Sequence, residues 1–136
     1  MGYILGNLFS IYVDTVNCFF EGKAEGQGKL WHGHVTAVTV SPDYRRIGLA
    51  SRLMNHLEKG SEEQYNGYFV DLFVRVTNVL AQIMYTGLDY HVYRRVLEYY
   101  SGEEDAFDMR KALARDKSKE SIIPLKHPIT PDQLEW

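Results

Sequence analysis

The chain has 136 residues, enough for one domain with one hydrophobic core. Its 15 Lys and Arg residues and 18 Asp and Glu residues give a net charge of −3, and no basic excess indicates a nucleic-acid partner. The single cysteine, Cys18, has no partner for an intrachain disulfide, and no apolar run reaches the roughly 20 residues that cross a bilayer as a helix. We therefore expect a cytoplasmic protein that binds neither nucleic acid nor membrane directly.

The N-terminal part of the chain predicts strands separated by a turn. Residues 1–5 form a short apolar run, and residues 30–40 form a longer one that is typical of a strand. Residues 7–21 fit two patterns, because apolar residues alternate with polar ones, as in a strand, while another apolar set has helical spacing. Both alternatives stay open. Glycines and charged residues at 22–29 predict a turn.

The middle of the chain predicts two helices on either side of a buried strand. Residues 44–59 carry apolar side chains at helical spacing on one side, which predicts an amphipathic helix. Residues 67–76 are almost continuously apolar, as in a strand that a sheet buries on both faces. A second, shorter helix is predicted at residues 78–88.

The last third of the chain predicts a hairpin followed by an arm. Residues 90–101 and 106–113 flank an acidic turn and predict two antiparallel strands. Residues 114–136 are polar and punctuated by prolines, which favours an extended arm. The order of elements indicates an α/β domain with a mixed sheet at residues 1–113, and the arm at 114–136 follows it.

The junction between the strand at 30–40 and the helix after it has the composition of an anion site. A helix that starts directly after a strand presents free backbone N–H groups and the positive end of its dipole. Gly48 lets an anion approach the backbone closely, and Ala50 keeps the next turn small. Arg45 and Arg46 supply forked donors suited to phosphate oxygens. The alternative is a surface helix start with two solvated arginines.

The same junction carries a resemblance to a known family. Residues 45–50 read R-x-x-G-x-A after a strand ending in V-T-V-S-P, which resembles the acetyl-CoA motif of GCN5-related N-acetyltransferases, the GNAT family. Residues 78–85 resemble the family's second signature, an asparagine and a tyrosine on one short helix. From about residue 22 onward, the chain is similar to the catalytic subunits of NatB-type N-terminal acetyltransferases, notably in WHGHVTAVTV, GYFVDLFVRVTN and RRVLEYYSGEEDAFDMRKAL. The resemblance implies the GNAT fold, a mixed central β-sheet with flanking helices, and acetyl-CoA as co-substrate.

The resemblance also implies a set of cofactor contacts. Backbone groups of Val38 and Val40 are expected to hold the pantetheine arm, and amides at the start of the helix are expected to hold the pyrophosphate. Tyr85 matches the family's tyrosine at the sulfur and is the candidate general acid, although a core aromatic on a helix is the alternative. Asn78 is expected to contact the cofactor arm, to cap its helix, or both. The full implied set is Val38, Val40, Arg45, Arg46, Ile47, Gly48, Leu49, Ala50, Ser51, Asn78 and Tyr85.

A second implied set concerns the peptide and the partners. NatB-type enzymes acetylate an initiator methionine followed by Asp, Glu, Asn or Gln. His34 and Thr36 lie two apart on one strand, so they share a face and match the readers of that second residue. Tyr99 and Tyr100 match residues that wall the peptide groove, and strand alternation predicts that one of them packs in the core. The implied partners are the helical-repeat auxiliary subunit of NatB and ribosome-associated nascent N-termini.

The resemblance implies no metal, and the spacing of the histidines shows no ligand cluster. The chain also departs from the family pattern. The family's first strand, first two helices and second strand are absent, and residues 7–21 interrupt a segment that is continuous in relatives. Asp89 replaces a glycine, which suggests a backbone with positive φ. The alternative function is therefore a shortened form with little or no catalysis, which binds acetyl-CoA or has no function.

Overall fold

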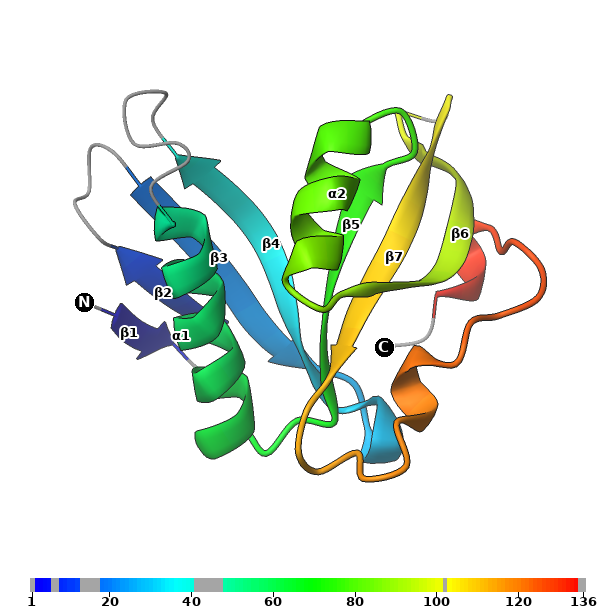
Figure 1. The fold of residues 1–136 in the computed structure, drawn as a ribbon. Coiled ribbons are helices and arrows are strands. Elements are labelled where there is room, and N and C mark those ends of the chain that lie inside the picture. Colours follow the sequence, from blue (N-terminus) through cyan, green and yellow to red (C-terminus); the bar gives the residue numbers. More distant parts are fainter. Residues whose placement is uncertain (1, 6–7, 13–17, 41–47, 102, 135–136) are drawn as a thin grey trace.

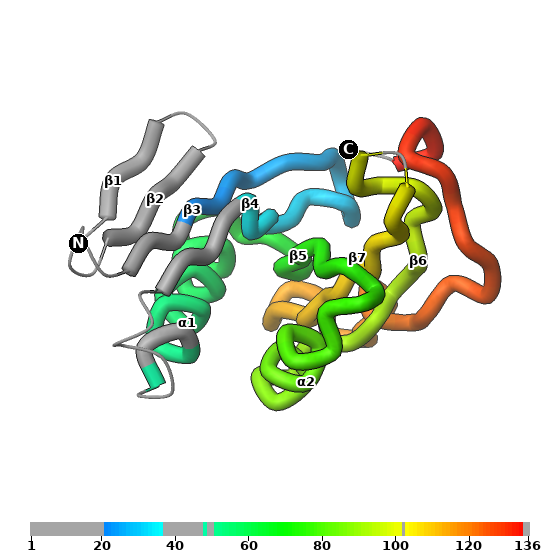
Figure 2. Tube along the Cα trace, turned by 90° about the horizontal axis from the view of Figure 1, so that it is seen from above, coloured from blue at the N-terminus to red at the C-terminus, as the bar shows by residue number. Residues whose placement is uncertain are grey.

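A computed structural model of the chain describes residues 2–5, 8–12, 18–40, 48–101 and 103–134, with the backbone alone at 2–5, 8–12, 18–20, 37–40 and 49–50. Seven strands form one sheet in the order β1-β2-β3-β4-β5-β7-β6, and two helices cover one face of it (Figure 1, Figure 2). The strands are β1 (Gly2–Leu5), β2 (Leu8–Tyr12), β3 (Cys18–Glu25), β4 (His32–Val40), β5 (Phe69–Arg75), β6 (His91–Tyr100) and β7 (Glu104–Ala112). The helices are α1 (Leu49–Glu63) and α2 (Val79–Gly87).

The N-terminal strands β1 to β4 form an antiparallel ladder. Of the two alternatives for residues 7–21, the strand is confirmed where the structure describes them, because β2 pairs with β1 and β3. The predicted turn at 22–29 is wrong at its start. The strand β3 continues to Glu25, and its register with β4 shifts between Glu21 and Gly22. Pairing with β4 overrides the local glycine signal there, and the chain turns only at Gly26, where φ is 96°.

The strands β4 and β5 are parallel and diverge along their length. They share a short run of register pairs, which are Gly33 with Val70, His34 with Asp71 and Val35 with Leu72. Beyond Val35, β4 continues to Val40 in pairing with β3, and beyond Leu72, β5 continues to Arg75 in pairing with β7. The carboxyl-terminal halves of β4 and β5 therefore separate, as Figure 1 shows.

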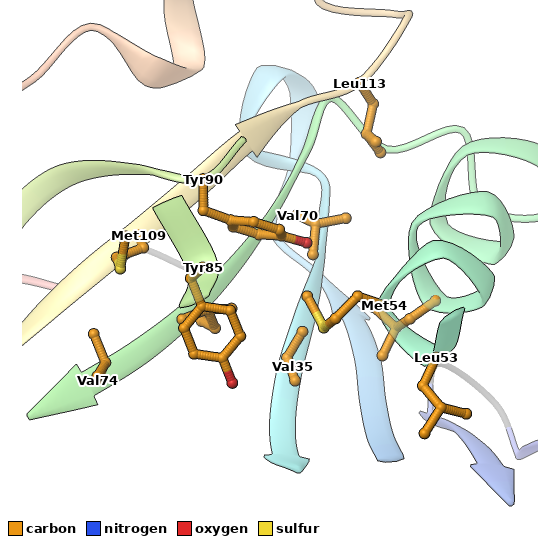
Figure 3. Packing of buried hydrophobic residues seen from close by; sticks show 11 residues of the cluster. Val35, Leu53, Met54, Val70, Val74, Tyr85, Tyr90, Met109 and Leu113 are labelled. Atoms are coloured by element: carbon orange, nitrogen blue, oxygen red, sulfur yellow. The ribbon is translucent and has the colours of Figure 1, made fainter. Parts of the chain in front are cut away.

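The hydrophobic core lies between the sheet and the two helices. Leu53, Met54 and Leu57 of α1 are fully buried, as amphipathic spacing requires. Each such side chain contributes about 1.5–3 kcal/mol by burial. The complete cluster is Val35, Leu53, Met54, Leu57, Val70, Leu72, Val74, Tyr85, Tyr90, Met109 and Leu113 (Figure 3). The helix predicted at 44–59 is confirmed from Leu49 and extends to Glu63, while residues 44–47 lie outside the described residues.

The predicted hairpin and arm both have counterparts in the structure. The strands β6 and β7 pair antiparallel, and the arm lies along the outer edge of β6. Leu125 N donates to Tyr93 O at 2.8 Å, and Ile129 N donates to Arg95 O at 2.9 Å. Short 3₁₀ turns at Glu120–Ile122 and Pro131–Gln133 interrupt the extended path. Within the described ranges, no helix is long and apolar enough to cross a membrane.

Candidate functional site

The first turn of α1 stands at the mouth of the space between β4 and β5 (Figure 1). Gly48 is its N-cap with φ 78° and ψ 9°, a left-handed conformation that glycine adopts without strain. No side chain caps this end, and the first backbone bond to Gly48 O comes from Arg52 N, at 3.1 Å. The amides of residues 49–51 therefore point beyond the helix. A Cβ at Gly48 would meet no described atom within 4 Å, so the described part of the chain does not cover these amides.

The other predicted residues of this mouth are placed only in part. Val38 and Val40 lie on the part of β4 that has left β5, and their backbone is described but their side chains are not. Leu49 and Ala50 are the first residues of α1, again with the backbone alone, and Ser51 follows them in a half-buried position. Three further predicted residues, Arg45, Arg46 and Ile47, lie outside the described residues.

The helix α2 brings Asn78 and Tyr85 to the other side of the same space. The Asn78 side chain caps the helix by accepting from Ala81 N at 3.2 Å, so the cap is confirmed. The Tyr85 ring packs in the core between β5 and β4, and its hydroxyl points in the direction of the strand ends (Figure 3). Burial, followed by nearby Tyr100, raises the pKa of Tyr85. Among the described residues, no hydrogen bond engages the Tyr85 hydroxyl.

The neighbouring Tyr90 differs from Tyr85 because its hydroxyl has a hydrogen-bond partner. Tyr90 packs edge-on against Tyr85 with ring centroids 6.0 Å apart. Its hydroxyl donates to Glu58 Oε2 at 2.9 Å, and Lys111 Nζ lies 2.9 Å from Glu58 Oε1. Tyr90 is therefore tied into an ion pair, whereas Tyr85 keeps a hydroxyl available for a ligand. The ring of Tyr85 is a core residue and its hydroxyl is not, so the two interpretations of this tyrosine are compatible.

His34 and Thr36 lie on the sheet face opposite the helices, as strand alternation predicted. His34 Nδ1 donates to Asp71 Oδ1 at 2.6 Å, and both side chains are buried. Thr36 is exposed, and its hydroxyl donates to Glu21 O at 3.1 Å. The His34 ring packs edge-on against Phe73 with centroids 5.4 Å apart. His34 and Asp71 therefore sit on the helix-free face, directly before β4 and β5 separate.

The fold places His34 in a cluster that spacing alone did not indicate. Ligand-type atoms of Glu25, His32, His34 and Asp71 lie within 4.8 Å of one another. His32 Nε2 lies 3.4 Å from a carboxylate oxygen of Glu25 and 3.4 Å from one of Asp71. Its Nδ1 faces Leu30 O. Burial disfavours the charged ring, but hydrogen bonds with Asp71 and Glu25 outweigh it and raise the pKa of His32 to about 9.

The donor types in this cluster are those of a transition-metal site, but the geometry is that of an ion-pair network. Tetrahedral ligands at zinc distances of about 2.0–2.1 Å stand about 3.3 Å apart. The 2.6 Å contact between His34 and Asp71 is a direct hydrogen bond. A protonated His32 already supplies the positive charge that Glu25 and Asp71 require. The contacts among these four residues are therefore described as an ion-pair network.

A second carboxyl group, that of Asp108, affects the charge of Asp71. Burial opposes ionisation of Asp71, but the charges and hydrogen bonds of His34 and His32 hold its pKa well below the usual range. Burial and the charge of Asp71 raise the pKa of Asp108 well above its usual range. Asp71 Oδ2 and Asp108 Oδ1 have no hydrogen-bond partner among the described residues, and the raised pKa of Asp108 keeps a second negative charge away from Asp71. Arg94 Nε donates to Asp108 Oδ2 at 2.9 Å.

Tyr99 and Tyr100 do not alternate as predicted. The register of β6 and β7 shifts between Val96 and Tyr100, and Glu98 has φ 50°. This bulge leaves both tyrosines half-buried against the same small cluster, so the prediction that one of them packs in the main core is wrong. The Tyr99 ring lies 4.7 Å from Phe73, and Arg75 lies over the Tyr100 ring at 4.1 Å.

The family profile of GNAT acetyltransferases matches residues 8–90. The chain belongs to this family. It is 69% identical over 114 residues to N-alpha-acetyltransferase 20 of Dictyostelium discoideum, which covers 84% of this chain and 66% of that protein. It is 64% identical over 118 residues to the N-terminal acetyltransferase B complex catalytic subunit NAA20 of Arabidopsis thaliana, which covers 87% of this chain and 68% of that protein. The chain thus spans about two thirds of the length of these relatives.

Solved GNAT structures agree with the fold. Chaetomium thermophilum Naa20 in complex with a bisubstrate analogue superposes with a TM-score of 0.80 and 35% identity, covering 92% of this chain and 76% of that one. A NatB acetyltransferase complex bound to CoA and MES gives a TM-score of 0.67 and 46% identity, covering 79% and 73%. The predicted GNAT fold with a mixed sheet is therefore confirmed. The missing family elements and the roles of individual site residues stay predictions.

In this GNAT chain, the predicted residues lie around the point where β4 and β5 separate, some on the helix-covered face of the sheet and others on the opposite face. Gly48 and Tyr85 approach the separation of β4 and β5 from the helix side. His34 lies at the same separation on the opposite face, with Tyr99 further along that face behind Phe73. A ligand that passes between the two strands would meet both groups.

Proposed function

We propose that the chain binds acetyl-CoA where β4 and β5 separate and transfers the acetyl group to the α-amine of a protein N-terminus. The observation that carries this proposal is the short run of β4–β5 pairs, which ends at Val35 and Leu72 with uncapped α1 amides at its mouth. Helix amides and a glycine without a Cβ suit a pyrophosphate. Solved relatives include a NatB complex bound to CoA.

Tyr85 is the group placed to assist the transfer. The amine attacks the thioester carbonyl, the carbon–sulfur bond breaks, and the departing thiolate takes a proton. The Tyr85 hydroxyl donates this proton, and its raised pKa keeps it protonated at neutral pH. The amine nitrogen loses one proton to solvent as the amide forms, and solvent returns a proton to the tyrosine after the transfer. Removal of such a donor lowers a rate by about 10² to 10⁴-fold.

The substrate class that fits is an initiator methionine followed by Asp, Glu, Asn or Gln. His34 and Thr36 place an imidazole ring and a hydroxyl on the helix-free face, and these groups suit an acidic or amide side chain. Tyr99 and Tyr100 form an aromatic wall along the same face. In this proposal the chain acts in the cytoplasm on ribosome-associated nascent N-termini, together with the helical-repeat auxiliary subunit of NatB. Solved relatives that are NatB complexes support such a partner.

One observation favours the alternative, a form that binds acetyl-CoA but transfers it poorly. The Thr36 hydroxyl is engaged by Glu21 O at 3.1 Å and by Glu21 Oε1 at 3.3 Å. Glu21 ends the stretch 7–21 that interrupts the family pattern. A substrate side chain would have to displace this contact before Thr36 could read it.

An assay on defined peptides separates the two candidates. The chain is incubated with acetyl-CoA and peptides that begin Met-Asp, Met-Asn or Met-Leu, with and without the auxiliary subunit, while calorimetry follows acetyl-CoA binding. Transfer to Met-Asp and Met-Asn but not Met-Leu supports the enzyme. Binding of acetyl-CoA without transfer supports the alternative, and an absence of binding would overturn both.

A further inference from the structure

The buried carboxylate of Asp71 is the one charged group among residues 69–74, the apolar run of β5 before Arg75. Asp71 is fully buried, and its register partner on β4 is His34. The two residues form the middle pair of the short β4–β5 contact. A buried charge at this place is costly unless it does something that an apolar side chain could not.

Asp71 holds the His34 ring by one edge. The 2.6 Å hydrogen bond keeps a proton on Nδ1, which sets the orientation of the ring and turns the Nε2 edge away from Asp71. Phe73, two residues along β5, packs against the ring at 5.4 Å and limits its rotation. The imidazole is therefore clamped by two side chains of the strand that borders the proposed site.

Asp71 is itself held in a fixed charge state. His32 donates toward the same oxygen that His34 contacts, at 3.4 Å. Asp108 adds a second charge-dependent contact, because burial and the charge of Asp71 raise its pKa, and Arg94 Nε donates to Asp108 Oδ2 at 2.9 Å. Asp71 thus interacts with His34 and His32 through one oxygen, and its charge is held among side chains of the neighbouring strands.

We propose that Asp71 is a positioning residue that orients His34 for an acidic second residue of the substrate. The proposal rests on the proposed function, in which His34 reads that residue. The carboxylate of Asp71 accepts from one edge of the imidazole and would stabilise a second proton on the opposite edge when a substrate carboxylate binds there. A neutral partner in place of Asp71 would keep the ring in place and remove this charge support.

The first test reads His34 directly and needs no activity. In the chain labelled with ¹⁵N-histidine, imidazole correlations report which ring nitrogen carries a proton. We expect His34 Nδ1 to be protonated in the wild type, and its signals to shift in Asp71→Asn. Identical His34 spectra in the two proteins would overturn the proposal, whatever the chain does with peptides.

The second test measures selectivity. Peptide–CoA conjugates beginning Met-Asp and Met-Asn are titrated into each protein by calorimetry. A charge-assisted hydrogen bond lost from Asp71→Asn should reduce the preference for Met-Asp over Met-Asn by about tenfold or more, while Met-Asn binding changes little. Since Asp71 acts through His34, adding His34→Gln to Asp71→Asn should reduce the preference no further.

Asp108→Asn is the conservative variant for comparison. Its amide can donate to Asp71, and its oxygen can accept from Arg94. We expect it to keep the preference for Met-Asp. Equal losses in Asp108→Asn and Asp71→Asn, or additive losses in the double variant, would show a general structural effect and overturn the proposal. If the wild type binds neither conjugate, the proposed function fails for this chain and Asp71 is reduced to a partner in a structural ion pair.

Discussion

Tyr85 contributes a hydroxyl to the proposed site, and Gly48 contributes space beside the backbone amides of α1. Tyr85 commits its ring to the core and leaves its hydroxyl without a partner in the described part of the chain. Gly48 takes a left-handed backbone and leaves the space next to the α1 amides empty. Tyr85 can therefore lose its hydroxyl with a small consequence for folding, whereas a side chain at Gly48 adds backbone strain to its effect on the ligand.

The hydroxyl of Tyr85 can be removed without disturbing the packing. Tyr85→Phe keeps the ring, and no hydrogen bond to a described residue is lost. We expect the melting temperature and the affinity for acetyl-CoA to stay nearly unchanged, while kcat falls by about 10² to 10⁴-fold. Steady-state kinetics on a Met-Asp peptide provide the measurement. An unchanged kcat with a lower melting temperature would identify Tyr85 as a core residue alone.

Gly48 tests the amide site. Gly48→Val forces a β-branched residue into φ 78°, which costs about 1–2 kcal/mol of backbone strain, and fills the approach to the amides. Gly48→Ala carries the strain with less bulk, and Ser51→Ala alters the same turn without either effect. We expect acetyl-CoA affinity by calorimetry to fall most for Val, less for Ala and least for Ser51→Ala. Equal, small losses in all three variants would exclude a phosphate contact at this turn.

At the scale of elements, hydrophobic periodicity predicted the helices and strands whose pattern lies within a single segment. The apolar spacing of residues 49–59 predicts α1, and the continuous apolar run of β5 predicts a buried strand, because each depends on one segment. The cluster of Glu25, His32 and Asp71 depends on three strands that meet only in the folded sheet, and no spacing in the sequence reports it. Its one visible sign was Asp71 itself, a charged residue within the apolar run of residues 69–74.

The same limit explains the errors at strand ends. The glycines of residues 22–29 indicated a turn, but pairing with β4 keeps 22–25 in a strand. Tyr99 and Tyr100 were expected to alternate, but a bulge in β6 places both against one cluster. Bulges arise from pairing with a neighbouring strand, so they cannot be inferred from the segment that carries them.

The strand cluster makes stability depend on pH through His32. Its folded pKa of about 9 lies above the usual histidine pKa of 6.5, so this contribution is full below pH 6.5 and is lost as the pH rises through 9. The shift corresponds to on the order of 3 kcal/mol at most. Glu25, Asp71 and His34 face the ring from β3, β5 and β4.

Urea unfolding at pH 6 and pH 9 measures this contribution, with His32→Gln as the reference. The reference removes the effect of Asp108, whose raised pKa also lowers stability with rising pH. We expect the wild type to lose more unfolding free energy between the two pH values than His32→Gln does. Parallel losses in the two proteins would mean that His32 is not charged in the fold.

For the whole molecule, the N-terminal strands provide the support of the proposed site. Beyond Val35, β4 has left β5 and pairs only with β3 among the described residues, through Cys18, Phe19, Phe20 and Glu21. The strand β2 in turn pairs with the same part of β3. The stretch 7–21, which resembles an insert in the sequence, therefore completes the sheet on the side where β4 borders the acetyl-CoA site.

Deletion of residues 7–21 tests this role. Without β2 and the first half of β3, the end of β4 would become an exposed edge on both sides, which favours aggregation and lets the backbone of Val38 and Val40 move. We expect the melting temperature to fall by at least about 5 °C, the size of shift that a loss of about 1 kcal/mol produces in a domain of this length. Acetyl-CoA affinity should fall with it, because the pantetheine arm is expected to lie along that backbone.

Deletion of residues 1–6 is the matched control, since it removes β1, an edge strand whose ladder partner is β2, and leaves β4 fully paired with β3. The control should melt close to the wild type and bind acetyl-CoA as tightly. If the 7–21 deletion does the same, the stretch is dispensable, and the sheet around the site must be supported by β4 and β5 alone.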